Sequence, residues 1–146
     1  MKLFKTKFKD LKIIKSPIFS DNRGYFKELV IEKNIDERFP FKVMSFSKKN
    51  VLRGMHLQLK YPQGKYISVI KGSILDVVID LRKKSKTYKK HFAIELKSSN
   101  YESLIIPPSC ANAFLTLEKN TLIHYYMGDF FEKNKYKGFR YNDPSF

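Results

Sequence analysis

The chain has 146 residues, of which 42% are hydrophobic, so it is long enough for one buried core and too short for two comfortable domains. Its 29 Lys and Arg residues exceed its 14 Asp and Glu residues, which gives a formal net charge of +15. A single cysteine, Cys110, excludes an intramolecular disulfide and a cysteine-rich zinc motif, and fits a reducing compartment. We therefore expect one domain over residues 1–146.

The N-terminal segment is basic, but the apolar stretch of about 7 to 15 residues that a secretory signal requires does not follow it. The longest apolar runs fall far below the roughly 18 residues of a membrane span. We expect a soluble protein of the cytoplasm with no membrane partner.

The positive charge raises the question of nucleic acid, because clustered lysines neutralise phosphates. The lysines are scattered from Lys2 to Lys137, and the densest group, within residues 83–90, looks like a turn and its edges. The chain has neither a basic helix nor an aromatic RNA-binding motif. We expect no nucleic-acid partner, and a lysine-rich surface that attracts anionic metabolites.

In chain order, the sequence first predicts a short helix over Asn34–Arg38, with Asn34 as its N-cap. Beyond it, apolar residues recur with a period of two, which is typical of strands. The expected strands are Lys65–Ile70, Ile74–Leu81, Lys90–Leu96, Leu104–Ile106, Ala111–Glu118 and Thr121–Met127. A hairpin-like Lys71-Gly72 pair separates the first two strands, and Lys119-Asn120 is a turn between the last two. Many short strands at turn spacings of about 8 to 12 residues predict an all-β sandwich or small barrel.

The alternation also assigns side chains to faces. Tyr125 shares a face with Ile123 and Met127, and His124 points the other way, so Tyr125 and His124 cannot both enter one cavity. Asp76 falls among apolar neighbours on its own strand, where a buried carboxylate is costly unless it is paired. We interpret Asp76 as the partner of a buried cation, with a wetter strand face as the alternative.

The segment Val51-Leu52-Arg53-Gly54-Met55-His56, with Lys65 nine residues on, is the most informative motif. It places His56 between two cations, Arg53 and Lys65. A base with a pKa near neutrality, a cation for a developing enolate and an arginine for phosphate are what proton abstraction from an anionic carbonyl substrate needs. The alternative is a packed or surface histidine without catalytic function.

Several short motifs follow one another in a specific order. They are Asp21-Asn22-Arg23-Gly24-Tyr25-Phe26, the segment 50–58, Gln63-Gly64-Lys65, the segment 72–85, Ile106-Pro107-Pro108, the region of Tyr125, and Tyr141-Asn142-Asp143-Pro144. Over most of the chain this order resembles the dTDP-4-dehydrorhamnose 3,5-epimerase family, which are cupin-fold enzymes acting on nucleotide-linked 4-keto sugars. The resemblance implies an all-β cupin, a double-stranded β-helix or jelly-roll-like barrel with little helix. It also implies an isomerase that inverts C3, C5 or both through an enolate and needs no cofactor.

Residue by residue, the family pattern makes His56 the general base and Lys65 the cation over the C4 oxygen. Tyr125 becomes the acid on the opposite face of the sugar. Arg53 and Arg23 become contacts of the substrate diphosphate, with Arg23 reaching into the site of a neighbouring subunit in a homodimer. The chemistry agrees, because a proton next to a ketone is removable only if the enolate is stabilised, and inversion needs a second group on the other side.

By the same resemblance, Asp76 matches an acidic active-site position, and Gln58 and Asn112 are expected to contact the substrate. Asn112 stands where the family usually carries a second histidine. Asparagine can form hydrogen bonds but cannot accept a proton, so the help that this histidine gives is altered. Similar relatives that act on nucleotide-linked 4-keto heptoses carry asparagine there, which is consistent with an active epimerase.

Two further departures concern the base and the nucleotide. The chain ends at Phe146, before the segment in which the family carries an aspartate that orients the base, so His56 is expected to lack that partner unless another acid replaces it. The positions that meet the nucleotide base in the family fall near Phe41 and Val43, so the identity of the base does not carry over.

A metal site is the alternative use of a cupin. Metal-binding cupins carry His-x-His, a following glutamate and a later histidine, whereas here His56 is followed by Leu57-Gln58 and the later position is Asn112. One candidate ligand of four remains, so we expect no metal.

Two other functions stay open beside the epimerase. A nucleotide-sugar 3,4-ketoisomerase is a similarly short cupin that also removes a C3 proton but returns it to a different atom. A degenerate cupin that binds sugar nucleotides or a protein without catalysis is made more credible by the missing histidine.

Overall fold

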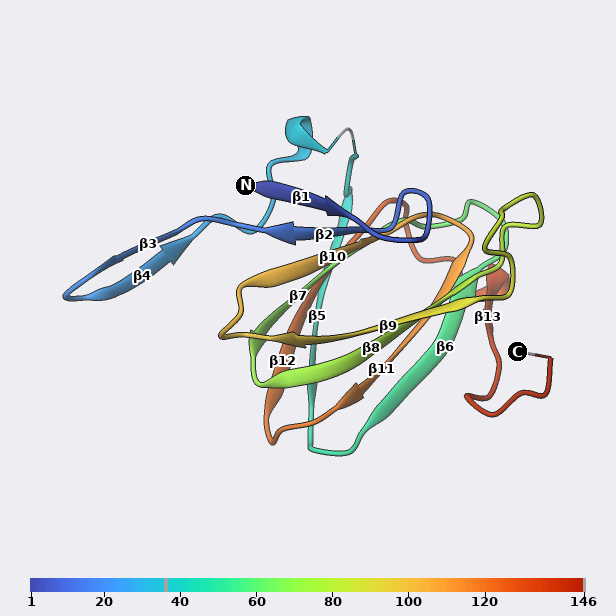
Figure 1. Ribbon diagram of the computed structural model, residues 1–146. Coiled ribbons are helices and arrows are strands. Elements are labelled where there is room, and N and C mark those ends of the chain that lie inside the picture. Colours follow the sequence, from blue (N-terminus) through green and yellow to red (C-terminus); the bar gives the residue numbers. More distant parts are fainter. Residues whose placement is uncertain (36, 146) are drawn as a thin grey trace.

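The computed structural model describes residues 1–35 and 37–145, and strands dominate it (Figure 1). The strands are β1 (Lys2–Lys5), β2 (Lys12–Lys15), β3 (Ile18–Asp21), β4 (Gly24–Lys27), β5 (Phe41–Ser47), β6 (Leu52–Gln58), β7 (Lys65–Lys71), β8 (Ser73–Asp80), β9 (His91–Lys97), β10 (Glu102–Ile106), β11 (Cys110–Thr116), β12 (Thr121–Met127) and β13 (Tyr136–Gly138). Two single 3₁₀ turns, η1 (Glu32–Asn34) and η2 (Lys133–Lys135), are the helical elements of the described residues. The all-β prediction is confirmed.

The strands form two facing sheets and a separate hairpin. The larger sheet has the order β1-β2-β10-β7-β12-β5, and the smaller one β13-β6-β11-β8-β9. One strand of each consecutive pair belongs to the larger sheet and the other to the smaller sheet; these pairs are β5–β6, β7–β8, β9–β10 and β11–β12. Strands that are neighbours within a sheet run antiparallel. Ribbons that bend from one sheet to the other are the arrangement of a jelly roll, which is the cupin fold that the resemblance implied.

The junction at Lys71-Gly72 corrects one expectation. β7 and β8 are not a hairpin, because β7 pairs with β10 and β12 while β8 pairs with β9 and β11. Gly72 instead marks the corner where the chain changes sheets. Its φ of +82° favours glycine, and a Cβ there would lie 2.7 Å from Oγ1 of Thr121. The signal for a sharp bend was therefore right, and the pairing inferred from it was wrong.

All six predicted strands are present, with ends that differ by at most two residues. The helix expected over Asn34–Arg38 is wrong in its place, because the turn η1 ends at Asn34, residues 37 and 38 are not helical, and position 36 lies outside the described residues. Phe39 explains the difference. It precedes Pro40, which disfavours helical backbone, and its side chain is buried beside Tyr66.

The main core lies between the two sheets. Its fully buried side chains include Ile67, Ile74, Val78, Leu104 and Ile123, which come from strands of both layers. The loop before β2 closes one end of the barrel with Phe8 and Leu11. A cavity opens beside this core, near the start of β7 and the end of β6.

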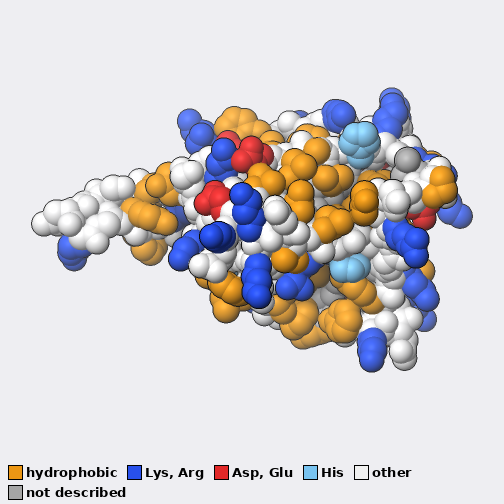
Figure 2. All heavy atoms as spheres, turned by 90° about the horizontal axis from the view of Figure 1, so that it is seen from below, with side chains coloured by type: hydrophobic (Ala, Val, Ile, Leu, Met, Phe, Trp, Pro, Cys, Tyr) orange, Lys and Arg blue, Asp and Glu red, His pale blue; other side chains and the backbone are white. Residues whose placement is uncertain are grey.

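The hairpin β3–β4 projects from the body of the molecule, at the left in Figure 1. It exposes Phe19, Tyr25 and Phe26, and Arg23 at its tip forms an ion pair with Asp21. On the face seen in Figure 2, Lys and Arg side chains are spread between hydrophobic ones rather than gathered into one patch. The described residues include no helix long and apolar enough to cross a membrane.

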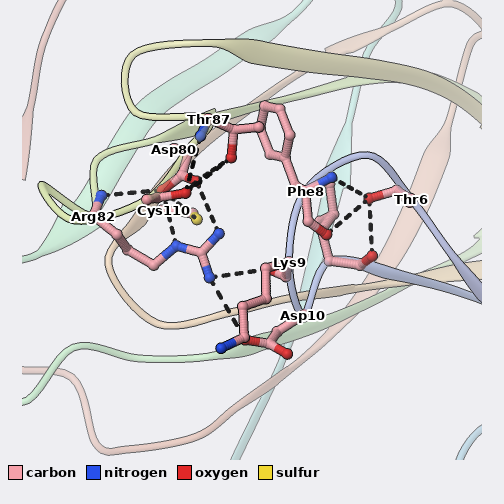
Figure 3. A network of polar contacts seen from close by, with 10 residues as sticks. Thr6, Phe8, Lys9, Asp10, Asp80, Arg82, Thr87 and Cys110 are labelled. Carbon is pink, nitrogen blue, oxygen red and sulfur yellow. Dashed lines mark hydrogen bonds and ion pairs between the residues drawn. The ribbon is translucent and has the colours of Figure 1, made fainter.

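A buried carboxylate ties together the loop after β8 (Figure 3). Asp80 accepts hydrogen bonds from Nε and Nη2 of Arg82 at 2.9 and 2.8 Å, and from the hydroxyls of Ser85 and Thr87 at 2.6 Å each. Nη1 of Arg82 in turn donates to the carbonyl of Lys9 at 2.9 Å, which attaches the N-terminal segment. Burial alone would raise the pKa of Asp80, but these hydrogen bonds outweigh it and hold the pKa below its usual range.

Replacing Asp80 with alanine should lower the free energy of unfolding by about 3 kcal/mol at pH 7, because it leaves Arg82 with only the more distant carboxylate of Asp10, at 3.8 Å. The folded-state pKa of Asp80 is depressed, so its stabilisation is present above the ordinary value of 3.8 and is lost as the pH falls below it. Urea denaturation of both proteins at pH 7 and pH 3 measures the difference, which should shrink at pH 3. Asp21→Ala, which breaks an exposed ion pair, is the control and should unfold like the wild type. A difference that grows as the pH falls would contradict the role given to the ionised carboxylate.

Candidate active site

A cavity of about 550 Å³ opens at the end of the barrel between the two sheets. Four of the predicted site residues line it together with Asn112: Arg53 and His56 from β6, Lys65 from β7 and Tyr125 from β12. The other lining residues are Phe41, Val43, Ser45, Leu52, Gly54, Gln63, Phe114, Met127, Phe131 and Tyr136. The fold therefore brings three cationic or titratable groups and a phenol into one space.

Strand register explains this convergence. His56 lies opposite Asn112 on the neighbouring strand β11, and both belong to the smaller sheet. Lys65 begins β7 in the larger sheet, opposite Met127 of β12. Tyr125 points between the sheets, as the alternation predicts, whereas His124 lies on the other face with its ring near that of Tyr126.

His56 is partly buried, and its pKa is lowered below the ordinary 6.5. Burial is the main cause, followed by the positive charges of Lys65 and Arg53. The ammonium of Lys65 also donates to the backbone carbonyl of His56 at 3.5 Å. A histidine in these surroundings is neutral at pH 7, which is the form that accepts a proton.

Lys65 is buried, with 6% of its surface exposed, and burial lowers its pKa to about 8 although the charge of Asp76 opposes this shift. Asp76 is completely buried beneath the cavity, and burial raises its pKa to about 7 against the effects of Asn112 and Lys65. Asn112 donates to Oδ1 of Asp76 at 2.8 Å, while Oδ2 has no hydrogen-bond partner among the described residues. Asp76 is thus electrostatically coupled to a buried cation, in agreement with its interpretation as a partner.

Tyr125 packs between Phe114 and the core, and its hydroxyl accepts a hydrogen bond from Ser45 at 3.4 Å. Burial raises the pKa of Tyr125 far above its ordinary value, and the hydrogen bond from Ser45 opposes this only in part. The phenol therefore stays protonated at neutral pH and is available as a proton donor.

Two expected substrate contacts lie outside the cavity. The side-chain amide of Gln58 forms its hydrogen bonds with the backbone. It donates to the carbonyls of Tyr61 and Phe130 at 2.9 and 3.2 Å, and it accepts from the backbone N–H of Glu132 at 3.0 Å. Gln58 thus holds the loops beside the cavity and is not among the residues that line it. Arg23 lies at the tip of the projecting hairpin and does not line the cavity of its own chain.

Sequence reasoning missed Ser45 and Tyr136. Ser45 comes from a strand in which two of the three exposed residues, Met44 and Phe46, are hydrophobic, so alternation gave no signal there. Tyr136 belongs to the three-residue strand β13, which pairs with β6 beside His56. Among the described residues, no group of three or more His, Cys, Asp or Glu side chains is placed to hold a metal ion.

Comparison with known proteins gives the family. A family model for dTDP-4-dehydrorhamnose 3,5-epimerase matches residues 5–146. The chain belongs to this family. It is 34% identical to the dTDP-4-dehydrorhamnose 3,5-epimerase of Methanothermobacter thermautotrophicus, over 98% of this chain and 80% of the relative. The enzyme of that name from Shigella flexneri is also 34% identical, over 99% of this chain and 84% of the relative.

Solved structures agree with the sequence relatives. The dTDP-4-dehydrorhamnose 3,5-epimerase of Bacillus anthracis, with TDP and PPi bound, superposes with a TM-score of 0.94 at 31% identity, over 99% of this chain and 86% of that one. The Legionella pneumophila epimerase in complex with dTDP-4-keto-L-rhamnose gives 0.93 at 32% identity, over 98% and 79%. Membership of the epimerase family makes the chain an isomerase, and it confirms the resemblance inferred from the motifs.

Proposed function

We propose that the protein inverts a carbon next to the ketone of a nucleotide-linked 4-keto sugar through an enolate. The observation that carries this proposal is the convergence of His56, Lys65 and Tyr125 on one cavity. His56 is the base that removes the proton, and Lys65 stabilises the negative charge that develops on the C4 oxygen. Tyr125 returns a proton to the other face, and Asp76, which accepts a hydrogen bond from Asn112, supports the charge of Lys65.

The cavity also supports an anionic substrate. Arg53 lies at its edge and is exposed, which suits the diphosphate of a sugar nucleotide. The related structures bind TDP or a dTDP-linked 4-keto sugar, which supports this class of substrate. Phe41 and Val43 line the cavity, and their side chains cannot form hydrogen bonds with a nucleobase. The proposed substrate class therefore leaves the identity of the nucleobase open.

Proton NMR of 4-keto nucleotide sugars incubated with the protein in deuterated water tests the function. The expected result is deuterium at a carbon next to the ketone together with inversion of that carbon. Migration of the carbonyl to C3 would identify a ketoisomerase. Absence of exchange with dTDP-, UDP-, GDP- and CDP-linked substrates would leave a protein that binds sugar nucleotides without turning them over.

The rate should follow a bell-shaped pH profile. The acid limb should lie below 6.5, because the pKa of His56 is lowered and only neutral His56 is a base. The alkaline limb should lie near 8, because Lys65 must keep its proton to stabilise the enolate. Asp76→Asn removes the charge that raises the pKa of Lys65, so it should move the alkaline limb to lower pH. Both profiles are obtained by measuring kcat/KM from pH 5 to 10. An alkaline limb that stays in place or moves to higher pH in Asp76→Asn would contradict this coupling.

We propose in addition a homodimer in which Arg23 completes the partner's site. Strand β5 is an edge of the larger sheet and exposes Met44 and Phe46, and open edges with apolar side chains are normally covered. The hairpin that carries Arg23 stands away from its own body and is apolar on its flanks. Two-fold pairing of identical subunits is the common way to cover such surfaces.

Mixing Arg23→Ala subunits with His56→Asn subunits tests this assembly. In a mixed dimer, the site that keeps His56 would receive the intact Arg23 of the other subunit, so one site of two regains activity. We expect activity above the sum of the separate variants after subunit exchange, which native mass spectrometry can verify. Activity equal to that sum in a verified mixture would show that Arg23 acts in its own subunit or not at all.

A further inference from the structure

The imidazole of His56 is held by packing rather than by a polar partner. Across residues 1–35 and 37–145, the imidazole of His56 has no hydrogen bond to either ring nitrogen, and the hydrogen bond from Lys65 goes to the backbone carbonyl of His56. A general base nevertheless needs a fixed direction, because a displacement of about 1 Å can cost 10²-fold in rate. Something other than a hydrogen bond must therefore fix the ring.

Strand β13 lies directly beside this ring. Its three residues pair antiparallel with β6, so that Gly138 lies opposite His56 and Tyr136 opposite Gln58. The amide and carbonyl of Phe139 extend this pairing, with hydrogen bonds of 3.2 Å to the carbonyl and amide of Met55. The short strand is thus attached firmly to the strand that carries the base.

Tyr136 covers one side of the imidazole. The two ring centroids are 5.1 Å apart with the planes tilted by 42°. The phenol ring is itself fixed by Phe131, whose ring packs edge-on at 5.1 Å. Both aromatic residues line the cavity, so the ring of Tyr136 separates part of the imidazole from water at the mouth of the site.

Gly138 closes the edge of the imidazole. A Cβ built at Gly138 would lie 3.2 Å from Cδ2 and 3.7 Å from Nε2 of His56, and 3.1 Å from the carbonyl oxygen of Met55. The contacts at 3.1 and 3.2 Å are tighter than normal packing, so a side chain at position 138 would push the imidazole or separate the strands. The backbone at Gly138 is not in the left-handed region, so alanine there changes only the space.

We propose that Tyr136 and Gly138 are positioning residues for His56, and that they hold the imidazole by packing in the direction that proton removal requires. This inference rests on the proposed function, because it assigns His56 as the base. It makes β13 part of the active site although neither residue needs to touch the reacting atoms.

The test combines kinetics with NMR titration of the His56 imidazole in Tyr136→Leu, Tyr136→Phe and Gly138→Ala. Tyr136→Leu should lower kcat about 10- to 100-fold with KM within about threefold. It should also raise the pKa of His56, because the ring that keeps water away is lost. Tyr136→Phe keeps the ring and should retain kcat within about threefold and the wild-type titration. Gly138→Ala should lower kcat and shift the imidazole resonances.

Several outcomes would overturn the inference. Equal losses of kcat in Tyr136→Leu and Tyr136→Phe would mean that the hydroxyl acts directly. Wild-type kcat and an unchanged His56 titration in Tyr136→Leu would mean that packing does not hold the ring. If Tyr136→Leu does not fold, the imidazole resonances of Gly138→Ala decide. NMR titration also separates the two proposals, because it reports on the imidazole even if the wild-type protein shows no exchange.

Discussion

Replacing His56 with asparagine is expected to reduce turnover by about 10²- to 10⁴-fold or more, while the affinity for the substrate stays within about tenfold. Asparagine keeps a polar side chain of similar reach, but it cannot accept the proton that must leave the carbon next to the ketone. The surrounding cations Arg53 and Lys65 remain and continue to attract the diphosphate and the carbonyl oxygen. Steady-state kinetics and calorimetric binding of the nucleotide diphosphate measure the two effects separately.

His124→Asn is the matched control for this prediction. His124 lies on the outer face of β12, away from the cavity, so its replacement should leave turnover within about twofold. Turnover of the His56 variant within about threefold of the wild type would assign the base to another residue. A loss that appears mainly in binding would instead make His56 a substrate contact.

The strands from Lys65 onward could be predicted from the sequence because their inward faces are apolar and their turns carry recognisable residues. The strands in the first part of the chain were harder to predict, because β5 carries apolar side chains on both faces. Val43 points inward, while Met44 and Phe46 point outward. A period of two is invisible in such a strand. The exposed hydrophobic residues belong to the edge for which we propose a partner.

The change from one sheet to the other at Gly72 could not be predicted from the sequence either. Glycine with a positive φ is required both in tight hairpins and in corners between sheets, so the residue identifies a bend and not its pairing. What distinguishes the two is the close approach of Thr121, which lies far along the chain. Local turn chemistry therefore predicted a boundary, while the jelly-roll topology came from the family resemblance.

The site could be predicted where its residues belong to motifs, and not where they depend on contacts between distant strands. His56, Lys65 and Tyr125 stand in recognisable segments and line one cavity. Gln58 shares the face of His56 by alternation, yet its strand ends there and its amide turns into the loops. Ser45 and Tyr136 reach the cavity only through pairing of strands that the sequence does not align.

The sharpest separation of roles is expected in Tyr125→Phe. Exchange of the proton next to the ketone for deuterium should continue, because His56 and Lys65 remain, whereas net inversion should fall by about 10²-fold. The high pKa of Tyr125 keeps its proton in place at neutral pH, and Ser45 supports the hydroxyl from the opposite strand. Without the hydroxyl, the enolate is reprotonated mainly from the side on which His56 removed the proton.

One NMR experiment in deuterated water measures both rates for this variant, with deuterium incorporation and the appearance of the inverted product followed in the same tube. Tyr126→Phe, at the next position on the outer face, is the control and should behave like the wild type. Equal losses of exchange and inversion would show that Tyr125 positions the substrate and does not return the proton. Among the described residues, Tyr125 is the one tyrosine of the larger sheet that lines this cavity. Full inversion in Tyr125→Phe would therefore mean that water or a group outside the larger sheet delivers the proton.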